Sequence, residues 1–309
     1  MMEAAAAAGS VSAPSAELIE RWEKEYSPSE WTKRFRTAGE VIDHHVKFVT
    51  EVSNRNRKEL KCDLDVEYGS EDSEKFDIYG DNLPDDAPLF VYIHGGYWQM
   101  LSKKESAYCA KPLVERGFRV IILDYELCPK VTLAELVSQI KCAGEYILNY
   151  AEENRVRHVS IAGHSAGAHL IAAMLDRQFV ATVGDEIRLV KHVYLISGVF
   201  KLDELRHTQS VNAKNLLGLN DANVRGLTPL EMDYGHLRGL PVQVHVSVAE
   251  NDSGVFKQMA KDMHEHLERF GVQGSLHVLP ELDHFDIVEK LAEKDYFITK
   301  AILDSFSEK

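Results

Sequence analysis

The sequence predicts an α/β fold with a mostly parallel central sheet and helices on both of its faces. Strand-like and helix-like segments alternate along most of the chain, as parallel strands joined by crossover helices require. The strand-like run 89–93 is apolar at every position, which is typical of a strand covered on both faces. The chain of 309 residues is long enough for one such domain, which we place at 16–309.

The N-terminal part is expected to precede this alternation. Residues 1–15 are mostly Ala, Ser, Gly and Pro, which predicts a disordered start, and no basic residue precedes the alanine run as in a secretory signal. Residues 16–54 have helical periodicity, and Ser27-Pro28-Ser29-Glu30 is typical of a second helix start. We expect a surface helical hairpin whose aromatic side chains either pack on the sheet or help to roof an active site.

The elements of the main fold follow in order. We expect strands at 61–68, 75–79, 89–93, 118–124, 158–162, 190–196, 241–248 and 274–279, the first two as an antiparallel edge. Helices are expected at 106–116, 133–152, 168–175, 255–270 and within 285–306. Residues 200–238 lack a strand pattern between two core strands, so this insertion is either a helical lid or a plain connection.

Charge and cysteine usage exclude several classes of partner. Lys and Arg number 35 against 49 Asp and Glu, a formal charge of −14, which opposes binding to nucleic acid or anionic membranes. The four cysteines have no metal-like spacing, so we expect buried free thiols and no metal site. No run of about 20 apolar residues could span a membrane. We expect a cytoplasmic protein; its oligomeric state, a homodimer included, stays open.

The run Gly163-His164-Ser165-Ala166-Gly167 stands between a strand-like and a helix-like segment. This G-x-S-x-G pattern in that context is typical of a nucleophile elbow, in which a tight turn lifts a serine hydroxyl into a cleft. Small residues on both sides of the serine let the neighbouring backbone pass close by. We therefore predict Ser165 as a nucleophile.

A serine nucleophile needs a base, and the base needs an anion to hold it. Asp252 follows the strand expected to end at 248, and His284 follows the strand ending at 279. Both belong to the carboxyl edge of the sheet, where ligands bind in open α/β folds. The order Ser165, Asp252, His284 is that of α/β-hydrolases. Glu250 and Asp283 are the rival acids.

Two further observations concern groups near the nucleophile. His94-Gly95-Gly96 follows a strand, so the amides of Gly95 and Gly96, with that of Ala166, are predicted to form an oxyanion hole. His164 is expected to pack or hydrogen-bond locally, because a base one residue from the serine cannot easily reach its hydroxyl.

These motifs resemble those of the α/β-hydrolase superfamily near its hormone-sensitive-lipase-like branch, and those of the kynurenine formamidase (arylformamidase) family. The resemblance covers about residues 20–305 and departs from the usual His-Gly-Gly-Gly at its third glycine. The segments that carry it are His94-Gly95-Gly96-Tyr97-Trp98, Tyr26-Ser27-Pro28-Ser29-Glu30-Trp31, Asp124-Tyr125-Glu126-Leu127-Cys128-Pro129 and Gly163-His164-Ser165-Ala166-Gly167-Ala168-His169-Leu170.

The resemblance implies hydrolysis of N-formyl-L-kynurenine, or a related aryl formamide, to the free amine and formate in tryptophan catabolism, without a cofactor. It also implies that Tyr97 and Trp98 stack on the aryl ring of this small-molecule substrate, although Trp98 is equally compatible with a place in the core. Two other functions stay open: a carboxylesterase for small aryl or short-acyl esters, and a non-catalytic binding protein with a hydrolase fold.

Overall fold

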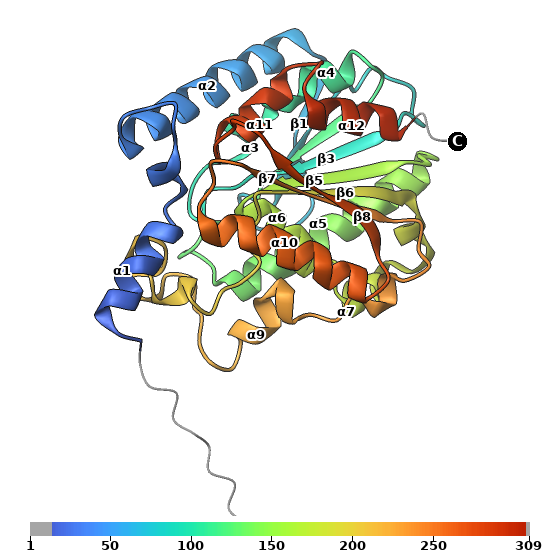
Figure 1. Cartoon of the computed structure of the whole chain (residues 1–309). Coiled ribbons are helices and arrows are strands. Elements are labelled where there is room, and N and C mark those ends of the chain that lie inside the picture. The colour runs from blue at the N-terminus through green and yellow to red at the C-terminus, as the bar shows by residue number, and fades with distance from the viewer. Residues whose placement is uncertain (1–13, 307–309) are drawn as a thin grey trace, which may run out of the picture.

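The strands form one eight-stranded sheet in the order β1-β2-β4-β3-β5-β6-β7-β8. The computed structural model describes residues 14–306 (Figure 1). From β4 to β8 all neighbouring strands are parallel, whereas β2 is antiparallel to both β1 and β4. The strands are β1 Cys62–Glu67, β2 Lys75–Tyr79, β3 Leu89–Ile93, β4 Arg119–Leu123, β5 Val159–His164, β6 Val190–Ile196, β7 Gln243–Ala249 and β8 Gln273–Leu279.

Helices cover both faces of this sheet, as the alternation predicted (Figure 1). On one face lie α2 Ala38–Glu59, α4 Ala110–Val114, α11 Asp286–Glu289 and α12 Phe297–Ser305; on the other lie α5 Leu133–Glu153, α6 Ala166–Met174, α7 Arg177–Val183 and α10 Gly254–Arg269. The remaining α-helices are α1 Ala16–Glu25, α3 Lys103–Ser106, α8 Gln209–Asn212 and α9 Val224–Leu227. Within residues 14–306 no helix is both long and apolar enough to cross a bilayer.

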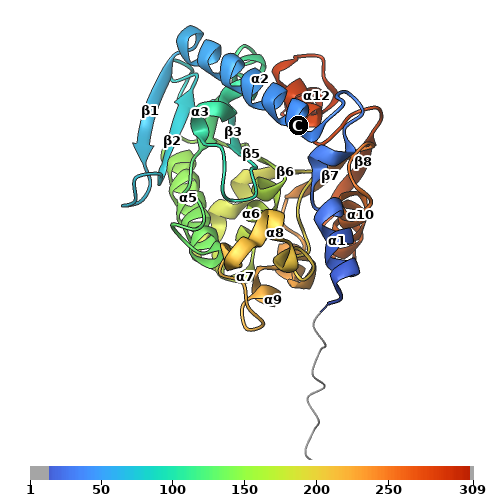
Figure 2. The same ribbon diagram turned by 90° about the vertical axis from the view of Figure 1, so that its left-hand side faces the viewer.

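Three element predictions need correction. Helices α1 and α2 do not form a hairpin: α1 packs beside α10, whereas α2 runs over the opposite face of the sheet (Figures 1 and 2). The second helix does not start at Ser27, because Pro28–Trp31 forms only a short 3-10 turn and a capping box at Thr37 starts α2. The helix expected at 106–116 is broken into α3, a 3-10 turn and α4.

The cysteine prediction is met only in part, and the N-terminal prediction falls almost wholly on residues that the structure does not describe. Residues 1–13 of the segment expected to be disordered lie outside the described residues, and Ser15 caps α1. All four cysteines are free, yet only Cys109 and Cys128 are buried, whereas Cys142 is exposed on α5.

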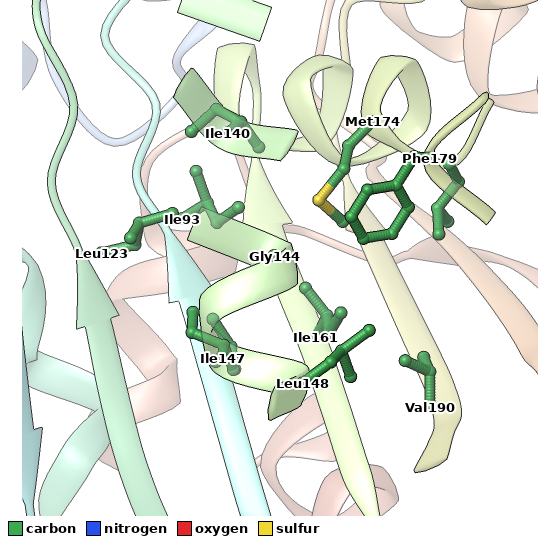
Figure 3. Close-up of a pocket in the computed structure, with 12 residues that line it drawn as sticks. Ile93, Leu123, Ile140, Gly144, Ile147, Leu148, Ile161, Met174, Phe179 and Val190 are labelled. Atoms are coloured by element: carbon green, nitrogen blue, oxygen red, sulfur yellow. The ribbon is translucent and has the colours of Figure 1, made fainter. Parts of the chain in front are cut away.

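A small apolar void lies between the sheet and helices α5, α6 and α7 (Figure 3). It encloses about 20 Å³ and is lined by apolar side chains and Gly144, where a Cβ would come within 2.8 Å of the Met174 sulfur. A space without polar groups gives a water molecule no hydrogen-bond partner. We therefore interpret this void as a packing defect of the core and not as a functional site.

Histidine side chains from neighbouring strands meet at the sheet. The Nδ1 atom of His192 lies 3.0 Å from Nε2 of His245, and the ring of His158 stacks on His192 at 5.4 Å. Burial, together with the nearby His192, lowers the pKa of His158 and of His245 to about 4. These two side chains therefore resist protonation in the folded protein.

The lowered pKa values of His158 and His245 predict that the folded protein loses stability in mild acid. The unfolded chain binds protons at an ordinary histidine pKa of about 6.5, above the folded value, so stability falls as pH drops from about 6.5 toward 4. Between pH 8 and pH 5 we expect these two histidines to lower the free energy of unfolding by about 2–4 kcal/mol. Urea denaturation should therefore show a smaller loss in His245→Gln than in the wild type, and an equal loss in the two proteins would contradict the prediction.

Candidate active site

Ser165 occupies the sharp turn between β5 and α6. Its φ of 53° and ψ of −114° lie outside the conformations that serine prefers. A Cβ on Gly163 would come within 2.6 Å of the Gly167 backbone, and a Cβ on Gly167 would collide with the carbonyl oxygen of Ile93. Larger residues at 163 and 167 would therefore force the turn apart, which is the structural reason for the G-x-S-x-G spacing.

The histidine and the acid predicted from the sequence are in direct contact. Nδ1 of His284 lies 2.8 Å from Oδ1 of Asp252, and both side chains are buried. Because an ionised carboxylate only accepts hydrogen bonds, Nδ1 is the protonated nitrogen of the neutral ring, which leaves Nε2 as an acceptor. Ser165 and His284 line the same pocket. The arrangement can therefore accept a proton from a serine hydroxyl that attacks a bound substrate.

The rival acids point elsewhere. Glu250 accepts a hydrogen bond from the backbone amide of Glu281 at 2.8 Å. Asp283 pairs with Arg34, whose Nε lies 2.9 Å from Oδ2 of the aspartate. Of the three candidates, Asp252 is thus the one that contacts His284.

His164 hydrogen-bonds to a neighbouring loop, as the sequence predicted. Its Nε2–H donates to the carbonyl oxygen of His284 at 2.9 Å, and the two rings lie 4.6 Å apart. Burial, reinforced by the neighbouring His284, holds the pKa of His164 well below its usual range. A neutral imidazole here supports the backbone of the His284 loop.

The loop after β3 lies against the nucleophile turn. A Cβ on Gly95 would be 3.2 Å from the Cβ of Ser165, and Gly96 has a φ of 100° at a place where a side chain would collide with the Met100 carbonyl. Among residues 14–306, no hydrogen bond occupies the amides of Gly95, Gly96 or Ala166. These amides are thus available as donors to an oxyanion next to Ser165.

The pocket beside Ser165 encloses about 360 Å³. The N-terminal segment, α2, the loop after β3 and the insertion after β6 all contribute to its wall, and most of the side chains are apolar. The lining residues are Tyr26, Ser27, Pro28, Ser29, Ile42, His45, Val46, Gly96, Tyr97, Met100, Leu101, His164, Ser165, Ser210, Val211, His284 and Phe285. Mostly apolar walls with a few polar groups are typical of a small-molecule site.

The two aromatic residues predicted to contact substrate differ in position. Tyr97 lines the pocket, and its hydroxyl donates to the carbonyl oxygen of Tyr26 at 2.6 Å. Trp98 is fully buried, packs edge-on against His169 at 4.9 Å and is absent from the pocket lining. Trp98 therefore cannot stack on a ligand in this pocket, and its alternative place in the core is the correct one.

Sequence reasoning missed a polar residue that holds the acid. The hydroxyl of Ser197, just after β6, donates to Oδ2 of Asp252 at 2.7 Å. Its φ of 43° is unusual for serine. In the sequence, the only signal for this role is the Ser197-Gly198 pair that follows the strand-like run 190–196.

A second missed group ties the N-terminal segment to the His284 loop. Arg34 donates to both oxygens of Asp283, at 2.9 and 3.0 Å, and to Glu289 at 3.0 Å. Thr32 also donates to Asp283, at 2.6 Å. Burial and the charge of Asp283 raise the pKa of the nearby Asp286 to about 7. Three buried acids thus face one guanidinium beside the catalytic loop.

Removing this cation is expected to destabilise the fold and the loop. Arg34→Met leaves buried carboxylates without a counter-charge, so the free energy of unfolding should fall by about 2–4 kcal/mol; the side chain is 27% exposed, which places the effect below that of a fully buried pair. Chemical denaturation measures the loss. The matched variant Arg36→Met, at an exposed position, should change stability little, and equal effects of the two would contradict this role for Arg34.

Comparisons with known proteins agree with the fold and the motifs. The chain is 34% identical over 285 residues to a kynurenine formamidase of Drosophila melanogaster, covering 90% of this chain and 94% of that protein. It is 33% identical to a kynurenine formamidase of Danio rerio, covering 91% and 94%. The family model described as BD-FAE matches residues 76–222. An esterase structure from Pyrobaculum calidifontis superposes with a TM-score of 0.65 at 16% identity, covering 96% of this chain and 97% of that one, which shows the shared fold.

Proposed function

The chain belongs to the kynurenine formamidase family of α/β-hydrolases, and from this premise we propose that its pocket hydrolyses N-formyl-L-kynurenine to L-kynurenine and formate with Ser165 as the nucleophile. The observation that carries the proposal is the convergence of Ser165 and the Asp252-paired His284 on the wall of one mostly apolar pocket. Such walls suit the aryl ring of the substrate.

In the first half of the proposed reaction, the Ser165 hydroxyl attacks the formyl carbon while Nε2 of His284 takes its proton. The carbonyl oxygen becomes an oxyanion, which the amides of Gly96 and Ala166 stabilise, together with that of Gly95. The C–N bond then breaks. His284 returns the proton to the departing aryl nitrogen, which leaves as the free amine of kynurenine, and a formyl ester stays on Ser165.

In the second half, water takes the place of the amine. His284 accepts a proton from the water as it attacks the formyl ester, and returns that proton to the serine oxygen when the ester bond breaks. Formic acid leaves and ionises to formate, and the serine hydroxyl is restored. Asp252 keeps the imidazole oriented and stabilises its charged form in both halves, and Ser197 holds the second oxygen of that carboxylate.

The site suits a small acyl group. Tyr97 stands next to Gly96 in the pocket wall and is fixed by its hydrogen bond to the Tyr26 carbonyl. A formyl group carries only hydrogen on its carbonyl carbon, so it fits beside this side chain with the least displacement. We infer that acyl size, as well as the aryl ring, selects the substrate.

Comparison of two acyl groups on one amine tests the proposal. We expect N-formyl-L-kynurenine to yield kynurenine and formate in equal amounts, followed by kynurenine absorbance and an enzymatic formate assay. L-Kynurenine acetylated on the same aryl nitrogen should react roughly 10–200-fold more slowly, the range expected for one methyl group in a confined site. If the enzyme releases no kynurenine from N-formyl-L-kynurenine, the proposal is contradicted. The cytoplasmic location and the homodimer considered from the sequence stay predictions.

A further inference from the structure

We propose that His45 binds the carboxylate of the substrate's amino-acid end; this assignment rests on the proposed function and names a specificity-determining residue within it. Three histidines line the pocket: His45, His164 and His284. The reaction uses His284, and His164 is occupied by the backbone carbonyl of the His284 loop. His45 is thus the basic side chain of the wall that the chemistry leaves unassigned.

The position of His45 in the wall is well defined. It projects from α2, and Ile42 and Val46 on the same helix also line the pocket. Its ring packs against that of Phe285, at 5.2 Å, and Phe285 directly follows the catalytic histidine. His45 therefore belongs to the part of the wall next to the reacting groups, within reach of a substituent on a bound aryl ring.

The hydrogen bonding of His45 determines which nitrogen is available to a ligand. Nδ1 lies 2.9 Å from Oε1 of Glu289, and since a carboxylate only accepts, Nδ1 donates. Nε2 is then the nitrogen left for the pocket. When Nε2 carries a proton, the ring is a charged donor, and the adjacent carboxylate offsets the cost of burying that charge.

Glu289 is held in the ionised form that this arrangement needs. Burial raises its pKa, but the hydrogen bonds from His45 and Arg34 outweigh burial and lower it overall. Its other oxygen accepts from Arg34 at 3.0 Å, and His44 lies 3.8 Å away from it. Asp283 and Asp286 contact the same guanidinium, so acidic groups outnumber the arginine behind His45.

The chemistry of the substrate indicates what this donor binds. N-formyl-L-kynurenine ends in an α-carboxylate, and a largely desolvated carboxylate requires charged or hydrogen-bonding partners. The residues that line the pocket include no lysine and no arginine. Among these lining residues, His45 is therefore the side chain outside the catalytic group that can offer a positive charge to the carboxylate.

Two substrates that differ only in the carboxylate test this assignment. N-formyl-L-kynurenine carries it, whereas its decarboxylated analogue N-formylkynuramine keeps the aryl formamide and the amine. For His45→Gln we expect KM for N-formyl-L-kynurenine to rise about 10–100-fold, the range for loss of a charged hydrogen bond, with little change in kcat. Both constants for N-formylkynuramine should stay near their wild-type values.

The neighbouring histidine supplies a matched control. His44 is 43% exposed at its side chain and does not line the pocket, so His44→Gln should retain the wild-type preference for the carboxylate. Denaturation midpoints of both variants show whether the fold is intact, and His45→Asn replaces His45→Gln if the latter does not fold.

The outcomes separate this assignment from the proposed function. If His45→Gln raises KM equally for both substrates, or keeps the wild-type ratio of the two KM values, His45 only supports the pocket wall. Either result overturns the assignment. If the wild-type enzyme cleaves neither formamide, the proposed function fails and the assignment fails with it. The assignment is supported if His45→Gln, but not His44→Gln, loses the preference for the substrate that carries the carboxylate, while kcat stays near its wild-type value.

Discussion

Ser165→Ala is expected to reduce the release of kynurenine from N-formyl-L-kynurenine by about 10⁴-fold or more, because it removes the nucleophile on which the other catalytic groups act. The side chain is 3% exposed at a turn whose shape depends on Gly163 and Gly167. Losing one hydroxyl oxygen there should leave the fold and its denaturation midpoint almost unchanged. Steady-state kinetics followed by kynurenine absorbance measures the loss.

A serine on the preceding strand provides the control. Ser160 is buried in β5 and hydrogen-bonds to His158 at 3.0 Å, away from the pocket lining, so Ser160→Ala should keep most of the activity. A fluorophosphonate probe should label wild-type Ser165 and fail to label Ser165→Ala. Substantial residual turnover in Ser165→Ala would refute the assigned nucleophile. Failure of the probe to label folded wild-type protein would favour a non-catalytic binding protein.

His284→Ala is expected to lower kcat by a similar factor, because Ser165 then lacks the base that takes its proton. His164→Ala provides a stringent comparison, since both histidines line the pocket and their rings lie 4.6 Å apart. Removing His164 leaves the buried carbonyl of His284 without its donor, so the free energy of unfolding should fall by about 1–3 kcal/mol. Its effect on kcat should be far smaller than that of His284→Ala.

Kinetics and denaturation of the two variants, measured side by side, test the choice of base. A severe loss of kcat in His164→Ala beside near-normal turnover in His284→Ala would mean that the base was assigned to the wrong histidine.

The central sheet and the order of the candidate catalytic residues could be read from the sequence because both depend on local patterns. The apolar run at 89–93 coincides with β3 and the mostly apolar run at 190–196 with β6, since strands covered on both faces carry mainly apolar residues. The nucleophile turn has a local steric requirement for small residues. The acid and the histidine follow strands whose carboxyl ends meet at one edge of the sheet.

What could not be predicted depends on contacts between distant parts of the chain. Arg34 pairs with Asp283 across 249 positions of sequence, and no local pattern marks such a partner. Trp98 stands in a motif with Tyr97, yet one ring lines the pocket and the other is buried. The helical hairpin was wrong for a related reason: α1 and α2 each have an apolar face, but they pack on opposite faces of the sheet.

The central claim is that this pocket is a formamidase site and not a general esterase site. The direct measurement is kcat/KM for N-formyl-L-kynurenine and for p-nitrophenyl acetate with the same enzyme preparation. We predict the larger value for N-formyl-L-kynurenine, with both activities lost in Ser165→Ala. Negligible turnover of the formamide beside fast turnover of the ester would contradict the claim and identify a carboxylesterase for small aryl esters.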